Sequence, residues 1–190
     1  LVCNYIHEGD SPPGECPVCA TPKENFEPLL EEKTGQSTAQ GKEEEILIIG
    51  AGIAGISAAE AVRQASAKAR ITILSKENHM PYYRLNLTRL LAGELNENQL
   101  PIHPHNWFQE NNVNLVTGNP VSTIDTGKKE AKLKDGSVFP YDKLILTAGA
   151  HPFIPPFPGD AMENVTSLRH LDDARFILKQ AQTSKSIVVI

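Results

Sequence analysis

The sequence predicts an α/β fold that contains a parallel sheet and is preceded by a small cysteine-bearing module. Short apolar runs, of the kind that form buried parallel strands, occur at 46–49, 71–74 and 143–147. A glycine-rich turn and an alanine-rich stretch at 53–65 separate the first two runs, which gives the strand–turn–helix–strand order of a βαβ unit. All of the cysteines precede residue 20, so the first part of the chain is a different kind of structure.

Composition excludes several classes of protein. The 190 residues are enough for one full domain and a small one, and a content of 40% hydrophobic and 22% charged residues is typical of globular proteins. No apolar run approaches the roughly 20 residues of a membrane helix, and a net charge of −5 does not suggest a nucleic-acid partner. Because no secretion signal is present, we expect a cytoplasmic protein that binds neither membrane nor nucleic acid.

Composition also divides the chain into four segments. Residues 1–30 are rich in turn residues and carry the cysteines, whereas 31–45 contain almost no apolar side chain and predict a flexible linker. Residues 46–160 hold the α/β pattern. Residues 161–190 begin a further domain, whose opening strand is the apolar run at 186–190. We expect the sequence to be a fragment that is truncated at both ends.

Several shorter elements follow the βαβ unit. They are a short helix end at 107–112, strands at 113–116, 122–124, 130–134 and 137–139, and a helix at 172–182. Asp135-Gly136 is a hairpin turn signal. This signal predicts that the strands on either side of it pair with each other.

The turn after the first strand has the pattern G-x-G-x-x-G. It consists of Gly50, Ala51, Gly52, Ile53, Ala54 and Gly55, follows an apolar strand and opens a helix, which is the context that gives the pattern meaning. In a dinucleotide site the first glycine permits the turn, the second lets the backbone approach a pyrophosphate, and the third lets helix and strand pack closely. The helix N-terminus supplies N–H groups to the phosphates. The alternative is a glycine-rich turn that binds nothing.

An acidic side chain beyond the second strand completes such a site by binding ribose hydroxyls. Glu77 lies 22 residues after Gly55, which fits the expected spacing. Ser75 occupies the end of the strand itself. We therefore predict that Glu77 reaches the ribose from the following turn.

The segment YDKLILTAGA at 141–150 resembles the second flavin fingerprint of the two-dinucleotide-binding flavoproteins, in which a strand ends in T-x-G. Three further landmarks are ILIIGAGIAG, ENHMPYYRLNLTRLLAG and WFQENNVNLVTGNPVSTID. With them, residues 46–190 resemble the NAD(P)H:rubredoxin oxidoreductase family of FAD-dependent pyridine nucleotide-disulfide oxidoreductases, whose relatives include nitrite reductase large subunits and apoptosis-inducing-factor-like reductases. The resemblance implies a Rossmann-like FAD-binding domain, incomplete here, and then an NAD(P)H-binding domain.

The resemblance also implies roles for individual residues toward FAD. Arg84 would contact the pyrophosphate, Glu77 would hold the ribose, and Val121 would present backbone groups to the adenine. The residues that would line the cofactor are Thr147, Ala148 and Gly149. NAD(P)H would be the substrate of the complete protein. For Arg84 the alternative is a surface salt bridge.

Cysteines are absent from a segment where many members of this family relay electrons. The stretch from Glu77 to Gly93 contains none. Dithiol reduction and cysteine-sulfenate chemistry therefore lack their nucleophile there. We expect the flavin to pass electrons directly to an external acceptor, for which a one-electron metal centre is suitable.

The N-terminal module contains the C-x-x-C knuckle Cys16-Pro17-Val18-Cys19, which is typical of tetrahedral thiolate metal sites. Residues 2–29 resemble the rubredoxin domain of rubrerythrins, which implies an iron site with Cys3, Cys16 and Cys19 as ligands and a fourth cysteine before Leu1. Zinc remains the alternative, because both metals accept tetrahedral thiolates.

Four other residues of the module bear on the resemblance. Tyr5 and Phe26 match the small aromatic core of the rubredoxin domain. Asn4 and Ala20 stand where glycine is common, and alanine tolerates the left-handed backbone less well than asparagine.

These features predict an enzyme in which NAD(P)H reduces FAD, and FAD passes single electrons to a rubredoxin-type iron centre, attached or separate. Rubredoxin or another electron-transfer protein is the expected partner. In one alternative the cysteine module binds zinc for docking and the flavoprotein reduces a different acceptor. In another, the chain is the FAD-binding part of a nitrite-reductase-like subunit.

Overall fold

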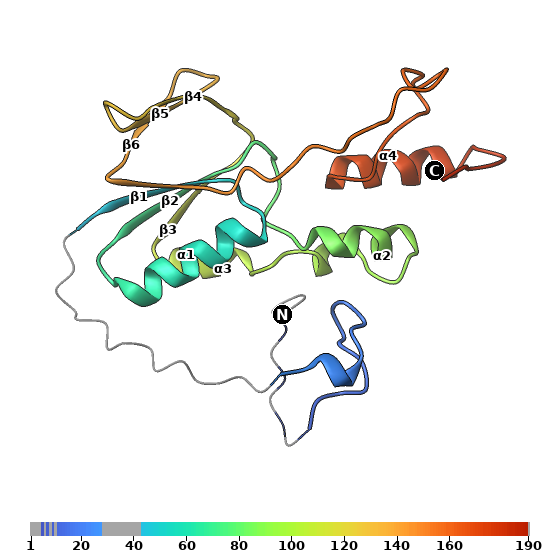
Figure 1. Cartoon of the computed structure of the whole chain (residues 1–190), viewed down its shortest axis with the longest axis horizontal. Coiled ribbons are helices and arrows are strands. Elements are labelled where there is room, and N and C mark those ends of the chain that lie inside the picture. Colours follow the sequence, from blue (N-terminus) through green and yellow to red (C-terminus); the bar gives the residue numbers. More distant parts are fainter. Residues whose placement is uncertain (1–4, 6, 8, 10, 28–42, 190) are drawn as a thin grey trace. The chain divides into compact units, whose positions relative to one another are not determined.

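The computed structural model describes residues 5, 7, 9, 11–27 and 43–189. The chain forms two compact units, Leu1–Gln36 and Ser37–Ile190 (Figure 1). Most of the predicted linker, 31–42, lies outside the described residues. None of the helices in the described ranges has the length and apolar character that a membrane span requires.

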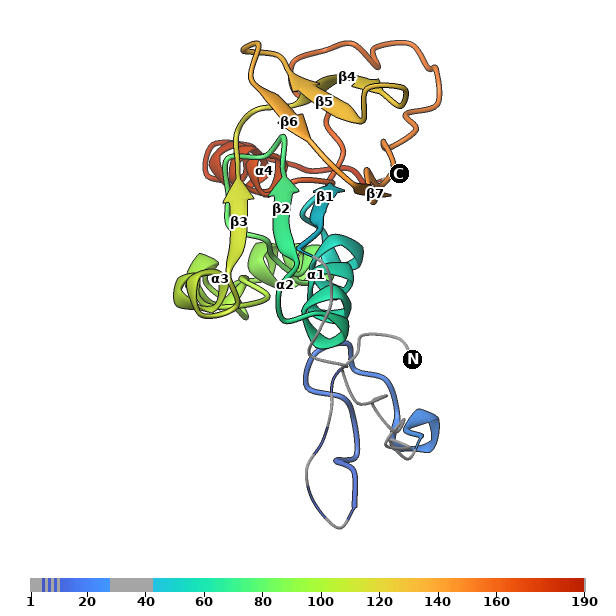
Figure 2. The same ribbon diagram turned by 90° about the vertical axis from the view of Figure 1, so that its left-hand side faces the viewer.

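The larger unit is built on a parallel sheet of four strands. These are β1 (Glu45–Ile49), β2 (Arg70–Leu74), β3 (Val113–Val116) and β7 (Lys143–Leu146), which lie in the order β3–β2–β1–β7 (Figure 2). Neighbours of β1 lie on both sides, because its Ile48 pairs with Ile73 of β2 and with Ile145 of β7. The predicted α/β fold class and its parallel strands are confirmed, but the strand predicted at 143–147 is not buried, because β7 lies at an edge of the described sheet.

Successive side chains of a strand point to opposite faces of the sheet, and both faces of this sheet pack against other core residues. Ile46 and Ile48 of β1 belong to a core shared with α1 (Ile53–Ala65) and α3 (His105–Glu110). Leu47, which lies between them, belongs to a second core on the opposite face. The helix at 53–65 is confirmed with the predicted bounds, and the short helix near 107–112 begins two residues earlier than expected.

A small antiparallel sheet contributes to the second core. Its strands β4 (Val121–Asp125), β5 (Glu130–Leu133) and β6 (Val138–Pro140) lie in that order. Leu133 of β5 is buried in the same core as Leu47 of the parallel sheet. The parallel sheet therefore lies between a helical layer and this antiparallel layer (Figure 1).

The hairpin between β5 and β6 forms at the predicted turn. Gly136 has a φ of +94°, a left-handed conformation that glycine adopts without strain. The carboxylate of Asp135 accepts a hydrogen bond of 2.8 Å from the N–H of Ser137. Both residues stabilise the turn through their own backbone or a residue two positions away, so the turn could be predicted from the sequence alone.

A third core joins α2 (Leu87–Leu91) to α4 (Leu171–Ala181), two helices that are far apart in sequence (Figure 1). Leu87 and Leu90 are buried in the same cluster as Leu171. The helix expected at 172–182 is confirmed. Sequence analysis missed α2, because so short a helix does not display a helical period.

The C-terminal run does not form the strand predicted at 186–190. Residues 186–189 have no regular structure, and residue 190 lies outside the described part. Ile187, Val188 and Val189 are 63%, 83% and 91% exposed. A strand satisfies its backbone groups through a neighbour, and none of the strands in the described ranges pairs with this run. The prediction is therefore wrong for 186–189.

Arg63 ties the end of α1 to the turn after α3. Its guanidinium donates five hydrogen bonds of 2.7–3.1 Å to the backbone carbonyls of Ser66, Ala67, Ala69, Asn111 and Asn112. The planar fork of arginine carries five N–H donors, so one side chain satisfies all of these acceptors.

We predict that Arg63→Met lowers the free energy of unfolding by about 2–4 kcal/mol, because it leaves several partly buried carbonyls without a donor while keeping an apolar stem. The measurement is urea unfolding followed by the fluorescence of Trp107, the single tryptophan. Arg70→Met is the control. Arg70 makes only exposed ion pairs with Glu43 and Glu45, so its loss should cost less than about 1 kcal/mol. Equal effects of the two substitutions would contradict the assignment.

Candidate cofactor site and cysteine knuckle

The two predicted fingerprints meet at the carboxyl ends of β1 and β7. The N–H of Thr147 donates to the carbonyl of Ile49 at 2.8 Å. The hydroxyl of Thr147 donates to the carbonyls of Ile49 at 3.0 Å and Gly50 at 2.9 Å. Since the sheet extends from β1 in both directions, this edge is a topological switch point, where open α/β sheets bind ligands.

Two of the three motif glycines are required by close packing within the turn. A Cβ on Gly50 would lie 2.1 Å from the carbonyl oxygen of Thr147, and a Cβ on Gly55 would lie 1.9 Å from the carbonyl oxygen of Gly50. Gly50 also has a φ of +111°. No side chain fits at either position, whether or not a ligand is bound.

Gly52 differs from the other two, because a Cβ at this position would meet no atom within 4 Å. Its φ of −78° is ordinary for any residue. Gly52 is the N-cap of α1 and makes no side-chain cap hydrogen bond, and the first turn of α1 contains no acidic residue. There is thus open space beside Gly52 at the amino end of α1, where the first N–H groups of a helix lack α-helical partners, and this arrangement fits a bound phosphate.

The surface around this turn is exposed and mostly apolar. Ile53 and Leu146 are 47% and 61% exposed although both are large and hydrophobic. Ala54, Ala148 and Gly149 are exposed as well, whereas Ala51 is partly buried. Apolar side chains and bare backbone at a switch point are suitable for contact with a flat, largely apolar cofactor ring.

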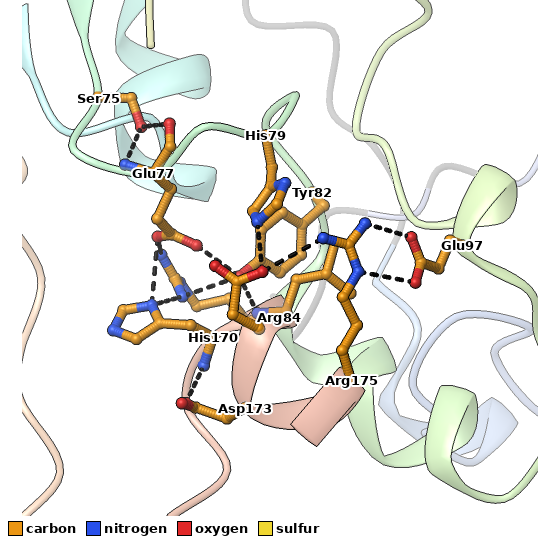
Figure 3. A network of polar contacts seen from close by, with 11 residues as sticks. Ser75, Glu77, His79, Tyr82, Arg84, Glu97, His170, Asp173 and Arg175 are labelled. Carbon is orange, nitrogen blue, oxygen red and sulfur yellow. Dashed lines mark hydrogen bonds and ion pairs between the residues drawn. The ribbon is translucent and has the colours of Figure 1, made fainter. Parts of the chain in front are cut away.

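The predicted ribose and pyrophosphate ligands, Glu77 and Arg84, form an ion pair with each other (Figure 3). Ser75 fixes the turn that carries Glu77, because its hydroxyl accepts the N–H of Glu77 at 3.2 Å and donates to its carbonyl at 3.3 Å. Glu77 thus lies in the turn after β2, as expected. Arg84 makes a salt bridge, but with a side chain only 29% exposed it is not the surface pair that was the alternative, and its predicted contact with a pyrophosphate stays a prediction.

Tyr82 and His170 complete a polar cluster around this ion pair (Figure 3). The hydroxyl of Tyr82 donates to the Glu77 carboxylate at 2.7 Å and accepts the N–H of Leu171 at 2.9 Å. Nδ1 of His170 lies 3.3 Å from the same carboxylate and 2.9 Å from Nη1 of Arg84. The cluster therefore attaches the beginning of α4 to the turn after β2.

The cluster controls two protonation states. Burial would raise the pKa of Glu77, but hydrogen bonds from Tyr82 and Arg84, together with the positive charge of Arg84, hold it below its usual value. Burial and the hydrogen bond to the Glu77 carboxylate raise the pKa of Tyr82 well above its usual value. At neutral pH Glu77 is ionised and Tyr82 keeps its proton.

Charged contacts hold the first half of α4 in place (Figure 3). Arg175 donates two hydrogen bonds to the carboxylate of Glu97, at 2.9 and 2.6 Å, and one to Asp172 at 3.2 Å. At the start of the helix, the carboxylate of Asp173 accepts the N–H groups of Arg169 at 2.8 Å and His170 at 2.7 Å. These contacts place the residues before α4 beside the site.

Val121 begins β4, and its strand is attached to the Glu77 turn. The N–H of Gly118 donates to the carbonyl of Glu77 at 3.0 Å, and the N–H of Asn119 donates to the carbonyl of Ser75 at 3.3 Å. The register with β5 is irregular between Val121 and Thr123. Val121, the residue predicted to contact the adenine, thus closely follows a segment that is hydrogen-bonded to the turn carrying Glu77.

Sequence reasoning missed Arg169. Its Nη2 atom lies 3.4 Å from the position that a Cβ on Gly149 would occupy. Its Nε is buried and, among the described residues, has no hydrogen-bond partner; the same is true of Oδ1 of Asn86. Unsatisfied buried polar atoms are rare in folded proteins, so both positions fit a missing polar group. No motif or periodicity signalled Arg169, because its place follows from the docking of α4.

In the described part of the cysteine module, backbone hydrogen bonds close a tight turn around Cys16 and Cys19. Cys16 is buried, and its N–H donates to the carbonyl of Thr21 at 2.8 Å. The N–H of Ala20 donates to the carbonyl of Cys16 at 2.9 Å, and Ala20 has a φ of +54°. Ala20 therefore adopts the left-handed conformation despite its Cβ. The third predicted ligand, Cys3, lies outside the described residues.

The aromatic residues expected in the core of this module lie together. The rings of Tyr5 and Phe26 meet edge to face, with centroids 6.5 Å apart. Within the described ranges, no group of three or more histidine, cysteine, aspartate or glutamate side chains has the arrangement of a metal site. In the larger unit, the ring of His103 stacks on that of Trp107, with centroids 4.2 Å apart.

We predict that Glu77→Gln lowers the free energy of unfolding at pH 7 by about 2–4 kcal/mol, since it leaves the partly buried guanidinium of Arg84 without its counter-charge. The folded-state pKa of Glu77 lies below the unfolded value, so this stability is present above the unfolded pKa and is lost as pH falls through the folded one. The difference in the free energy of unfolding between Glu77→Gln and the native protein should therefore shrink below about pH 4.

The measurement is urea unfolding of both proteins at several pH values. Glu94→Gln is the matched control, because the Arg89–Glu94 contact of 3.0 Å is more exposed. It should cost less than about 1 kcal/mol at any pH. A pH-independent effect of Glu77→Gln would show that the carboxylate charge is not what stabilises the cluster.

Two families match this chain. Residues 44–190 match the family described as pyridine nucleotide-disulphide oxidoreductase, and residues 1–27 match the rubrerythrin, rubredoxin-like domain. The chain is 35% identical over 146 residues to a rubredoxin-NAD(+) reductase of Pseudomonas putida, a match that covers 76% of this chain and 38% of that protein. It is 33% identical over 147 residues to a nitrite reductase (NAD(P)H) of Bacillus subtilis, covering 77% of this chain and 18% of that protein.

A solved structure shares the fold. The NADH:rubredoxin oxidoreductase of Clostridium acetobutylicum is 33% identical with a TM-score of 0.66, and the match covers 74% of this chain and 36% of that one. The chain thus spans well under half the length of these relatives. Because the family match extends over residues 44–190, the chain belongs to the pyridine nucleotide-disulphide oxidoreductase family.

Proposed function

We propose that the larger unit binds FAD at the carboxyl ends of β1 and β7. The observation that carries this proposal is the open space at Gly52, before the uncapped amino end of α1. The N–H groups at the start of α1 suit the pyrophosphate, because the first N–H groups of a helix lack α-helical partners and the helix dipole favours negative charge at this end. The residues whose backbone would contact the cofactor are Gly50, Ala51, Gly52, Ile53, Ala54 and Gly55. After the end of β7, the residues that would line the cofactor are Thr147, Ala148 and Gly149.

The polar cluster supplies the side chains of the proposed site. Glu77 stays ionised well below neutral pH, so it can accept hydrogen bonds from ribose hydroxyls. Arg84 is oriented by Glu77 and by the carbonyl of Arg169 at 2.9 Å, and it serves as the cationic neighbour of the pyrophosphate. We add Arg169 to the proposed contacts, and Val121 provides backbone groups to the adenine.

The full-length protein is proposed to carry electrons from NAD(P)H through FAD to a rubredoxin-type iron centre, either attached or in a separate rubredoxin. FAD supplies the chemistry when bound, because it accepts a hydride and releases electrons singly. The residues of this chain bind and orient it, and the stretch from Glu77 to Gly93 offers no cysteine to relay the electrons. The match of residues 1–27 to the rubredoxin-like domain supports an attached acceptor.

The proposed domain limits are 1–30 for the rubredoxin-like module, 31–45 for the linker, 46–160 for the FAD-binding domain and 161–190 for the start of the NAD(P)H-binding domain. Cys3, Cys16 and Cys19 are the proposed metal ligands. A cytoplasmic location suits them, because thiolate ligands must stay reduced.

Two other functions have a specific observation in their favour. A knuckle of this geometry also suits zinc, in which case the module serves docking and the flavin reduces a different acceptor. The likeness to a nitrite reductase favours a nitrite-reductase-like subunit, whereas the N-terminal rubredoxin-like match favours the rubredoxin reductase.

We predict that Gly52→Val weakens FAD binding by about tenfold or more, because a side chain would occupy the space where backbone and pyrophosphate approach each other. The thermal midpoint of the FAD-free protein should fall by only a few degrees, because a Cβ at this position meets no atom within 4 Å, although valine is a poorer N-cap residue than glycine. Equilibrium dialysis with FAD is the measurement. Gly14→Val, also in open space but in the cysteine module, is the control. Unchanged FAD affinity in Gly52→Val would refute the proposed site.

The route of the electrons is tested by anaerobic titration of the full-length protein with NADH, with iron and zinc quantified in the same sample. We expect iron to be present, and both the flavin and the ferric-thiolate absorption bands to bleach. Bleaching of the flavin alone, with zinc in the protein, would favour the docking alternative and refute electron transfer to the attached module.

A further inference from the structure

Thr21 contacts both described cysteines of the knuckle. Its hydroxyl oxygen lies 2.9 Å from Sγ of Cys19, and its carbonyl accepts the N–H of Cys16 at 2.8 Å. The left-handed backbone at Ala20, with a φ of +54°, turns the chain back at the residue between Cys19 and Thr21. The hydroxyl is therefore held at the sulfur by the backbone of the knuckle itself.

Metal binding would fix the direction of this hydrogen bond. With a thiol, either the sulfur or the hydroxyl can donate. A metal-bound cysteine is a thiolate that has lost its proton, so only the hydroxyl of Thr21 can then donate. Hydrogen bonds to a charged acceptor are stronger than those between neutral groups. The contact thus gains strength when the module holds its metal.

We propose that Thr21 sets the reduction potential of the metal centre by donating a hydrogen bond to Sγ of Cys19. This inference rests on the proposed iron-binding function of the module. Reduction adds negative charge to an iron–thiolate centre, and a donor to sulfur stabilises that charge. Thr21 is therefore a positioning residue that favours the reduced state, which is the state that an acceptor of flavin electrons must reach.

The test compares Thr21→Val with the native sequence in the full-length, iron-loaded protein. Valine keeps the shape of threonine but has no donor. We expect the equilibrium constant for one-electron reduction of the iron to fall by up to about tenfold, a shift of about 59 mV to lower potential. Spectroelectrochemistry with chemical mediators measures this potential without NADH. A potential unchanged from the native protein would overturn the proposal.

Three variants control for other effects. Thr21→Ala removes the donor with less bulk than valine, and it should lower the potential even if Thr21→Val loads iron poorly. Thr21→Ser keeps the hydroxyl and should retain a potential close to the native one. Ser11→Ala removes an exposed hydroxyl from the same module and should change nothing. A fall in potential for Thr21→Ser as large as that for Thr21→Ala would also refute the role of the hydroxyl.

A second measurement separates this proposal from the function on which it rests. In protein loaded with Co²⁺, the loss of a donor raises the energy of the sulfur lone pairs, so the thiolate-to-cobalt absorption band of Thr21→Val should move to longer wavelength. An unmoved band overturns the role of Thr21 even if the native metal is zinc. Conversely, if NADH fails to reduce the iron while mediators reveal the lowered potential, electron transfer from flavin is refuted and the role of Thr21 holds.

Discussion

The carbonyl oxygens of Gly50 and Thr147 occupy positions that side chains on Gly55 and Gly50 would need. This close approach lets β1, β7 and α1 meet at a single turn, where the hydroxyl of Thr147 satisfies the carbonyls of Ile49 and Gly50. The parallel sheet is anchored at that turn, and β2 and β7 lie on opposite sides of β1. The open edge used by the proposed cofactor site is therefore a consequence of the same packing that holds the sheet together.

The polar cluster around Glu77 performs a different task. It joins residues from the turn after β2 to residues at the start of α4, through contacts that span 85 to 89 positions in sequence. Tyr82 links the two parts directly, because its hydroxyl serves both the Glu77 carboxylate and the N–H of Leu171. The side chains proposed to bind the cofactor are thereby oriented by structure rather than left to find their positions on binding, which reduces the entropic cost of binding.

In both units of the chain, the fold places polar groups at the candidate binding site. In the larger unit, backbone N–H groups and an arginine–carboxylate cluster suit an anionic cofactor, while the cysteines are confined to the smaller unit. There, the left-handed backbone at Ala20 turns the chain so that the hydroxyl of Thr21 lies at Sγ of Cys19. In both proposed sites the protein would contribute orientation and electrostatics, and the bound group would supply the redox chemistry.

The sequence by itself determined the features that depend on neighbouring residues. The strand at 113–116, the helix at 53–65 and the turn at Asp135-Gly136 were all predicted from local periodicity and turn chemistry, as was the glycine pattern at 50–55. Only the tertiary structure decided that Glu77 pairs with Arg84 and His170, that Arg169 lies against Gly149, and that α2 forms against α4. Most of those contacts join segments distant in sequence, and the Glu77–Arg84 pair bridges an irregular stretch of backbone, so no local pattern encodes them. The apolar run at 186–189 makes the same point, because an apolar segment becomes a strand only where another strand satisfies its backbone.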